Sequence, residues 1–405
     1  MKAESTNRSE PLKQTGAAKP GVRPIADEPN IDGKPVYTVE TRILNPDSLF
    51  REKGLCDGPT FSPGSACVYS CRYCYVEAMM NRGGSAVSDT LEKTGTRFQD
   101  VVIRRNQPME RLRAELRDTR GQLRYKEDTG TVYASPAVDV AATVELARET
   151  TDLCLEILES TGWTIRLLSK SPLLKQIAAA IPARWKRRVI YSLSTGTLDE
   201  ALAKAIEPDA PPPAKRLETL KELQQEGFRT FAMLCPILPQ DPVAYAKEAA
   251  ERIDFDACEH VWAEVLNRRG ASMQRTAQAL EEAGLTQWAQ RLHRVFGKGS
   301  TPAWEAYGRD TFNALADVVP AGKLRFLQYV TRASRGFWTA QEERGAILLG
   351  KATKRAKKST SQKSPPSAKR SAAGKKAWKT IHRNRAKSAT VPPPSRESDL
   401  AKGGL

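Results

Sequence analysis

Three cysteines lie close together in the run Cys67-Val-Tyr-Ser-Cys71-Arg-Tyr-Cys74. Their Cys-x3-Cys-x2-Cys spacing brings three thiolates into one short loop, and no fourth cysteine follows at close range. A cubane [4Fe-4S] cluster takes one protein ligand for each iron, so three thiolates leave one iron open to a small molecule. The spacing therefore predicts a cluster that takes part in chemistry, not one that only carries electrons.

Other roles for these cysteines stay open. A structural zinc site needs four ligands, and the fourth would have to come from a distant residue, either Cys56, Cys235, Cys258 or one of the three His. A disulfide framework suits the chain less well, because 405 residues with 40% hydrophobic content can bury a core without covalent cross-links. The remaining alternatives are a zinc site and three cysteines without a chemical role.

After the cysteines, short aliphatic or β-branched runs alternate with amphipathic stretches. The runs that predict strands are 101–105, 131–134, 164–168, 188–193, 228–234 and 261–265. The stretches that predict helices are 108–117, 143–160, a helix opened by Ser171-Pro172, 214–226 and 242–252. This alternation is typical of a parallel sheet with right-handed crossovers. Residues from about 270 to 345 are predicted to be mostly helical and to pack at the outside or edge of the sheet.

Polar side chains follow the predicted strands. In parallel α/β folds, functional groups collect at the carboxyl ends of strands. Those ends carry Ser135-Pro136, Ser169-Lys170-Ser171, Ser192-Leu-Ser194-Thr195, Cys235-Pro236 and the segment from Glu264 to Asn267. We expect these groups to converge on one rim and to suit a small polar ligand, although helix capping or turn formation explains any one of the serines equally well.

The cysteine spacing, with Tyr73 directly before the third Cys, resembles the cluster loop of the radical S-adenosyl-L-methionine (SAM) superfamily. Further segments are similar in order and spacing to the spore photoproduct lyase-like branch of that superfamily. They are Leu167-Leu-Ser-Lys170-Ser-Pro, Val189-Ile-Tyr-Ser192-Leu-Ser-Thr, the segment from Ile206-Glu207 to Arg216-Leu, and Pro236-Ile-Leu-Pro239. The resemblance covers roughly residues 50–270, well over half of the chain.

This resemblance implies a fold and a chemistry. The fold would be a partial (β/α)6-type radical SAM barrel with helical C-terminal additions, for which six or seven strand–helix units suffice, and a flat doubly wound sheet is the alternative. In the superfamily, the amino and carboxylate groups of SAM fill the open iron site. The reduced cluster then cleaves the sulfonium to give a 5′-deoxyadenosyl radical, which abstracts hydrogen from a substrate.

The resemblance also implies roles for single residues. Family members contact SAM through the residues that match Lys170 and Ser192. With the rim residue Ser135 and the loop residue Tyr73, the expected SAM contacts are Tyr73, Ser135, Lys170 and Ser192. Glu207 and Arg216 match family positions for which we expect a structural carboxylate–guanidinium pair.

One departure from the family pattern concerns the substrate. The true lyases split a thymine dimer adduct in DNA and carry a hydrogen-donating Cys just past the third strand, where this chain has Ser135. A hydroxyl hydrogen is too strongly bound to quench a carbon radical in the same way, so we expect a different, unassigned substrate. Cys235, at another strand end, is a candidate catalytic residue, and burial in the core is its alternative role.

Positive charge is concentrated at the C-terminus. The chain has a net charge of +17, and residues 351–405 hold sixteen Lys and Arg against two acidic residues, which leaves +3 for residues 1–350. We expect a disordered segment at 1–35, a core domain at 36–345 and a disordered basic tail at 346–405, since the tail has few large apolar residues. The tail segment around Trp378 suits nucleic acid, by phosphate contact and base stacking, and a tail that only aids solubility is the alternative.

Two hypotheses for the whole protein follow. The first is a radical SAM enzyme that takes electrons from a donor such as flavodoxin or ferredoxin and binds nucleic acid through residues 351–405. The second is a non-catalytic nucleic-acid-binding protein with a structural zinc or an inert iron–sulfur site. No apolar run of about 18 residues occurs and the N-terminus offers no apolar signal segment, so we expect a cytoplasmic protein without a membrane span.

Overall fold

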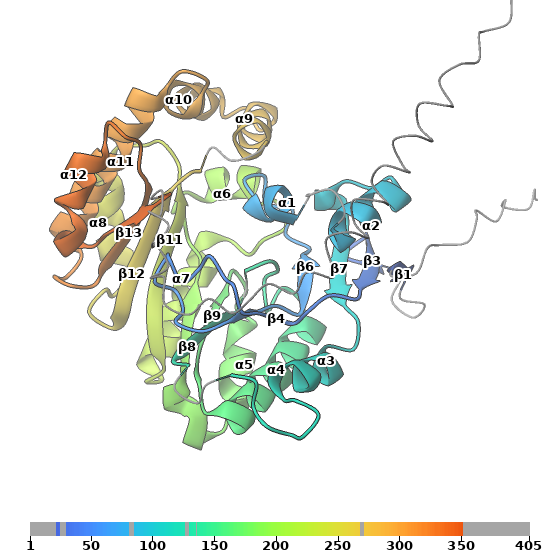
Figure 1. The fold of residues 1–405 in the computed structure, drawn as a ribbon. Coiled ribbons are helices and arrows are strands. Elements are labelled where there is room, and N and C mark those ends of the chain that lie inside the picture. Colours follow the sequence, from blue (N-terminus) through green and yellow to red (C-terminus); the bar gives the residue numbers. More distant parts are fainter. Residues whose placement is uncertain are drawn as a thin grey trace, which may run out of the picture. The chain divides into compact units, whose positions relative to one another are not determined.

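A nine-stranded sheet forms the centre of the computed structural model, which describes residues 22–24, 30–80, 85–125, 129–134, 136–267 and 271–350 (Figure 1). In spatial order its strands are β14 (Ala346–Leu349), β13 (Leu324–Tyr329), β12 (Cys258–Val265), β11 (Arg229–Ile237), β10 (Val189–Leu193), β9 (Thr164–Ser169), β8 (Thr131–Ala134), β5 (Thr60–Phe61) and β4 (Leu44–Asn45). Neighbours from β14 to β5 are parallel, and β4 is antiparallel to β5. The predicted α/β class is confirmed. Because β4 and β14 lie at opposite edges of this order, the strand pairing does not establish the predicted partial barrel.

Helices follow the strands as the alternation predicts, except that the helix at 200–206 was not predicted. They are α3 (Pro108–Leu116), α4 (Val144–Thr161), α5 (Leu174–Ala180), α6 (Glu200–Ile206), α7 (Pro213–Gln225) and α8 (Pro242–Arg252). In α4, Leu146, Leu153 and Ile157 recur at helical spacing and are buried. The helix begins at Thr143, whose side chain accepts a hydrogen bond from the Leu146 N–H, and ends at Gly162, which has a φ of 67°.

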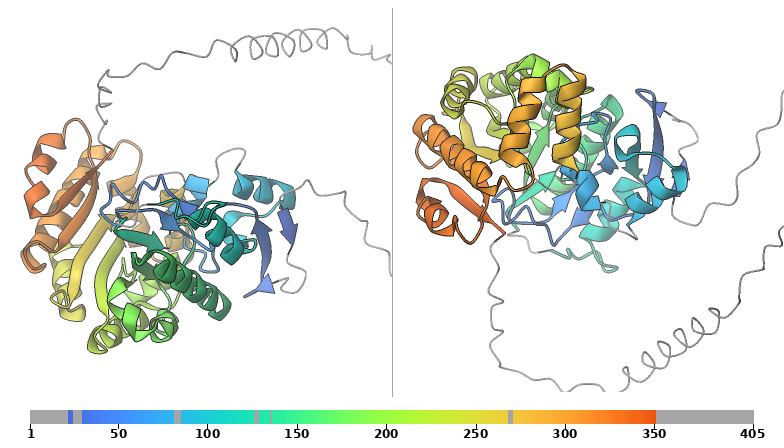
Figure 2. Two further views of the ribbon diagram at one scale, coloured as in Figure 1. Left: turned by 60° about the horizontal axis from the view of Figure 1, so that its bottom comes forward. Right: turned by 90° about the horizontal axis from the view of Figure 1, so that it is seen from above.

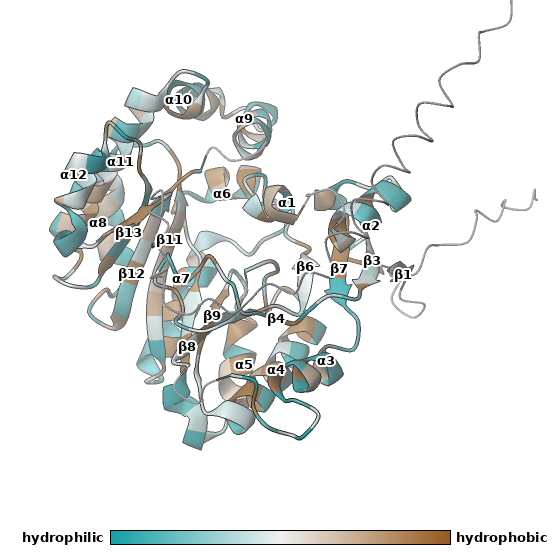
Figure 3. Ribbon diagram, viewed as in Figure 1, coloured by the Kyte–Doolittle hydropathy of each residue, from teal (hydrophilic) through white to brown (hydrophobic). Residues whose placement is uncertain are grey.

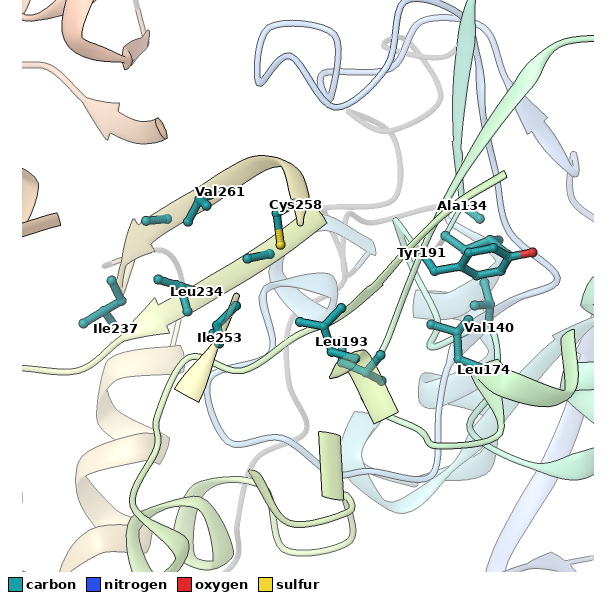
Figure 4. Close-up of a cluster of buried hydrophobic side chains, with 14 of the residues drawn as sticks. Ala134, Val140, Leu174, Tyr191, Leu193, Leu234, Ile237, Ile253, Cys258 and Val261 are labelled. Atoms are coloured by element: carbon teal, nitrogen blue, oxygen red, sulfur yellow. The ribbon is translucent and has the colours of Figure 1, made fainter. Parts of the chain in front are cut away.

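Hydrophobic side chains cover both faces of the main sheet. Tyr191 and Leu193 of β10 belong to a large cluster shared with α4 and α5. Ile190 points to the other face and joins a second cluster with Leu55 and Phe231, because successive side chains of a strand alternate. Figure 4 shows part of the large cluster, and Figure 3 marks strand β9 as hydrophobic. This second cluster, called the interior cluster below, lies where this face of the sheet packs against the loop that contains Leu55, not against a helix.

The first predicted strand does not belong to the main sheet, which corrects the sequence prediction. The run 101–105 forms β7 (Val102–Arg105) in a smaller sheet with β1 (Val22–Pro24), β2 (Asn30–Ile31), β3 (Lys34–Val39) and β6 (Gly64–Ala66) (Figure 2). Strand β7 is parallel to β3 and antiparallel to β6. Hydrophobic alternation identifies a strand but not its partners, which here are set by distant segments.

The prediction that residues 270–345 are mostly helical was right for four helices, but it missed the strand at 324–329 and did not foresee the strand that follows at 346–349. Helices α9 (Ser272–Glu282), α10 (Thr286–Phe296), α11 (Thr301–Val318) and the short α12 (Arg335–Thr339) are present. Strands β13 and β14 follow them and extend the parallel sheet at its edge. Each is short, at six and four residues, so its pattern is easily overlooked among helices.

Most of the predicted N-terminal segment 1–35 and all of residues 351–405 lie outside the described residues. Strand β14 lies beyond the predicted end of the core domain at residue 345. None of the helices in the described ranges is long and apolar enough to cross a membrane.

Candidate cluster and cofactor site

The three cysteines lie in the loop that joins β6 to α1 (Tyr75–Met80). The Arg72 N–H donates to the Ile206 carbonyl (2.8 Å), which ties the loop to the end of α6. Lys34 of β3 donates to the Val68 carbonyl and the Ser70 hydroxyl and pairs with Asp209 (2.9 Å). The loop is thus anchored to the small sheet on one side and to the main sheet's helical layer on the other.

A cavity of about 550 Å³ opens beside this loop. All three cysteines line it, together with Tyr73, Lys170, Ser194 and Cys235. Because Lys170, Ser194 and Cys235 follow or end strands β9, β10 and β11, the cavity lies at the carboxyl ends of the parallel strands. The sequence prediction that these residues meet at one rim is therefore correct for this group.

The three cysteines of the loop are partly buried. Burial raises the pKa of Cys67 and of Cys74 to about 11 and that of Cys71 to about 12. Such thiols are protonated at neutral pH until a metal displaces the proton. Within the described ranges, no three His, Cys, Asp or Glu side chains are arranged to hold a single metal ion. A cubane cluster does not need that convergence, because each thiolate binds a different iron.

Two of the distant cysteines, Cys258 and Cys56, are buried in hydrophobic clusters and give no support to a zinc site. Cys258 is buried in the large hydrophobic cluster, where Figure 4 places it near Val261. Cys56 is buried in the interior cluster beside Leu55, away from the cysteine loop's own cluster. His260 packs against the Trp262 ring at 5.1 Å, and burial lowers its pKa to about 4.

Lys170 points its amino group into a polar corner of the cavity. Its Nζ donates to the Ser194 hydroxyl (3.3 Å), lies 3.8 Å from a Glu207 carboxylate oxygen and lies 5.7 Å from the centre of the Tyr73 ring. The Asp139 carboxylate accepts from the Lys170 backbone N–H (2.6 Å) and so positions the residue. This places a cation next to the cysteine loop, where a ligand carboxylate would be stabilised.

Glu207 and Arg216 form the predicted ion pair, which is confirmed. Their side chains are 2% and 1% exposed. Arg216 also donates to the Pro211 carbonyl (2.7 Å) and the Ser194 carbonyl (3.0 Å), while Glu207 accepts from the Tyr73 hydroxyl. The pair therefore connects the cysteine loop to the end of β10.

Two predicted SAM contacts are not part of the cavity wall that the structure describes. Ser192 is fully buried, and its hydroxyl has no hydrogen-bond partner among the described residues. Ser194, which directly follows β10 and points to the same side as Ser192, does line the cavity. Ser135 lies outside the described residues.

Several residues that position the site had no separate signal in the sequence. Arg275 of α9 donates to the Arg72 carbonyl (3.1 Å) and the Cys74 carbonyl (3.2 Å), and it pairs with Glu77. Gly196 packs so closely against the chain that a Cβ would lie 2.2 Å from the Pro236 carbonyl oxygen. Helix α9 and the turn after β10 thus hold the cavity wall in place, although neither belongs to the strands and helices whose alternation predicted the sheet.

Cys235 lines the cavity beside Glu264 and is half-buried. Its Sγ is 3.9 Å from Glu264, and burial, followed by the Glu264 charge, raises the pKa of Cys235 to about 12. Glu264 pairs with Lys53 (2.9 Å) from the loop before β5. Cys235 also packs against the interior hydrophobic cluster, so its S–H group lies between the core and the cavity.

No protein-family model matches the chain. The uncharacterised protein ORF301 of Acidianus two-tailed virus is 25% identical over 250 residues, which span 59% of this chain and 79% of the viral protein. The uncharacterised protein MJ0683 of Methanocaldococcus jannaschii is 26% identical over 189 residues, which span 45% of this chain and 64% of that protein.

Among solved structures, the chain is similar to spore photoproduct lyase. One mutant of that enzyme aligns with a TM-score of 0.43 and 12% identity, over 65% of this chain and 79% of the other. Its complex with dinucleoside spore photoproduct aligns with a TM-score of 0.41 and 11% identity over the same shares. A mutant with bound AdoMet and dinucleoside spore photoproduct aligns with a TM-score of 0.37 and 12% identity, over 60% and 75%.

Proposed function

We propose that this protein is a radical SAM enzyme of the spore photoproduct lyase-like branch with an unassigned substrate. The observation that carries the proposal is the shared cavity of Cys67, Cys71, Cys74 and Lys170 at the carboxyl ends of parallel strands. Three thiols from one loop suit a [4Fe-4S] cluster with an open iron, and a cation beside them suits the carboxylate of SAM. With both groups bound, reductive cleavage of SAM would supply a 5′-deoxyadenosyl radical for hydrogen abstraction.

The chain's own residues then have distinct tasks. The three thiolates hold the cluster, and Lys170 pairs with the SAM carboxylate. Ser194, which lines the cavity and accepts from Lys170, supplies a hydrogen bond at the strand end. Apolar and aromatic side chains form most of the wall, including Tyr73, and keep water from a reactive carbon radical.

Metal content distinguishes this function from a structural zinc protein. Protein purified without oxygen is expected to be brown and to carry iron and sulfide, because three thiolates from one loop, with no fourth cysteine in that loop, favour a cluster over tetrahedral zinc. Elemental analysis of the purified protein measures this directly. Colourless protein with one zinc per chain, unchanged after incubation with iron and sulfide, would contradict the proposal.

Cys235 is the candidate catalytic residue. Its S–H group faces the cavity, and an S–H bond is weak enough to pass a hydrogen atom to a carbon radical, whereas the Ser135 hydroxyl is not. Neutral thiol is the form that carries this hydrogen, and the raised pKa of Cys235, from burial and the Glu264 charge, keeps the thiol protonated.

Replacing Lys170 by Ala is expected to weaken SAM binding by about 2–3 kcal/mol, the contribution of a charge-assisted hydrogen bond. Anaerobic calorimetry on reconstituted protein measures the affinity, and the cluster's spectrum should not change. Lys175→Ala is the matched control, because Lys175 pairs with Glu222 (2.9 Å) on the helical surface and does not line the cavity. Equal SAM affinity in both variants would assign Lys170 a structural role.

The basic tail is proposed to bind nucleic acid through its closely spaced cations, with Trp378 stacking on an exposed base. Electrons would come from a donor such as flavodoxin or ferredoxin.

Truncation after residue 350 removes +14 of the +17 charge and keeps every cysteine. Full-length protein is expected to bind DNA or RNA with a log–log salt slope of about −4 to −5 for six phosphate contacts, and the truncated protein should bind far more weakly. Fluorescence anisotropy across a salt series provides the measurement. Equal, salt-insensitive binding by both proteins would exclude the tail as a nucleic-acid tether.

A further inference from the structure

The cavity wall contains an ion pair outside the cysteine loop that the proposed cofactor chemistry does not use. Lys53 and Glu264 lie 2.9 Å apart, with side chains 20% and 9% exposed, and both line the cavity. Their opposite charges compensate each other. The pair is separate from the Lys170 amino group, which lies 3.8 Å from a Glu207 carboxylate oxygen.

Lys53 is held in place although it belongs to a loop. The Trp262 indole N–H donates to the Lys53 carbonyl (3.0 Å). Arg166 donates to the Leu55 carbonyl, and its guanidinium packs over the Trp262 ring at 4.7 Å. Glu264 is two residues after Trp262 on the same strand, so strand β12 positions both partners of the ion pair. The pair is preorganised, which reduces the cost of ordering it around a ligand.

Aromatic rings line the cavity near the pair. The Phe50 ring lies 5.1 Å from Tyr133 and 6.5 Å from Tyr75, and Lys53 Nζ lies 5.8 Å from the centre of the Phe50 ring. Tyr133, Tyr75 and Phe50 all line the cavity. Such a wall favours a flat, largely apolar group that packs against it.

We propose that Lys53 and Glu264 form a specificity site for an uncharged, planar substrate group that carries a hydrogen-bond donor next to an acceptor, as an aromatic carboxamide does. The carbonyl of such a group accepts from Lys53 while its N–H donates to Glu264. A carboxylate in the same place meets the Glu264 charge, and an ammonium group meets the Lys53 charge, so both are disfavoured. The inference rests on the proposed function only in assigning the part of the cavity beside Lys53 and Glu264 to the substrate.

Two probes of the same shape test the site: 4-fluorobenzamide, which is neutral, and 4-fluorobenzoate, which is an anion. Fluorine NMR titration of full-length protein gives the affinity of each. We expect the amide to bind at least about tenfold more tightly than the carboxylate, the effect of a single charge-assisted hydrogen bond. Glu264→Gln leaves Lys53 without its compensating charge, so the preference should reverse in favour of 4-fluorobenzoate.

Glu248→Gln is the matched control, because Glu248 also pairs with a cation, Arg252 (3.0 Å), but lies on the outer surface of α8. It should keep the preference for the amide. Equal binding of the two probes to unmodified protein, absence of binding by either, or an unchanged preference in Glu264→Gln would overturn the proposal. The titration is repeated on Cys71→Ala protein, which lacks a proposed cluster ligand. Preference retained there, together with absence of iron in unmodified protein, would refute the cluster while leaving the specificity site intact.

Discussion

Replacing Cys71 by Ala is expected to abolish cluster assembly and with it all SAM cleavage. Each of the three loop cysteines closes the coordination of one iron, and no other cysteine of the described ranges lies in the same loop to replace it. The measurement is iron and sulfide content after anaerobic reconstitution, with 5′-deoxyadenosine production as the second readout. Cys67→Ala and Cys74→Ala are expected to behave alike.

Cys154→Ala is the control for loss of a thiol as such. Cys154 is fully buried on α4, so its replacement should cost about 0.5–3 kcal/mol of stability and leave iron content unchanged. Iron and 5′-deoxyadenosine at the unmodified level in Cys71→Ala would contradict the assigned ligands.

Arg216→Ala is expected to cause the largest loss of stability among single changes at the site. It leaves the Glu207 carboxylate buried without its guanidinium partner, and removing one member of a buried pair costs about 3–5 kcal/mol. It also removes the hydrogen bonds to the Pro211 and Ser194 carbonyls. Urea denaturation followed by circular dichroism measures the free energy of unfolding.

Lys215→Ala is the neighbouring control. Lys215 pairs with Glu218 on the exposed surface of α7, where such pairs contribute less than about 1 kcal/mol. The double change Arg216→Met with Glu207→Gln should recover part of the loss, because it removes the charge that Arg216→Ala leaves uncompensated. Similar stabilities of Arg216→Ala and Lys215→Ala would show that the buried pair is not a structural element.

Local sequence was enough to predict elements whose signals lie within a few residues. Helix α8 has the predicted bounds Pro242–Arg252, because Asp241 accepts from the N–H groups of Val243 and Ala244 and Pro242 suits the first helical turn. Strand β7 was assigned to the wrong sheet because its partners β3 and β6 come from distant segments. Strands β13 and β14 were missed because short strands after long helices give a weak pattern.

The site also combines residues with local sequence signals and residues whose roles depend on distant contacts. The cysteine loop and Lys170 were predictable, since spacing within one loop and the position at a strand end are both local. Lys53 and Arg275 were not, because their contacts are with Glu264 and Cys74, about two hundred residues away in the chain. Ser192 lies in β10, and Ser194 follows the strand on the same side. The sequence alone does not show that Ser192 is fully buried whereas Ser194 lines the cavity.

Reductive SAM cleavage is the most direct test of the proposed function. Full-length protein is reconstituted with iron and sulfide without oxygen, reduced with dithionite and incubated with SAM, and 5′-deoxyadenosine and methionine are measured by mass spectrometry. We expect both products in reconstituted protein and neither in Cys71→Ala protein treated in the same way. Reconstituted, iron-replete protein that leaves SAM intact after reduction would contradict the assignment as a radical SAM enzyme.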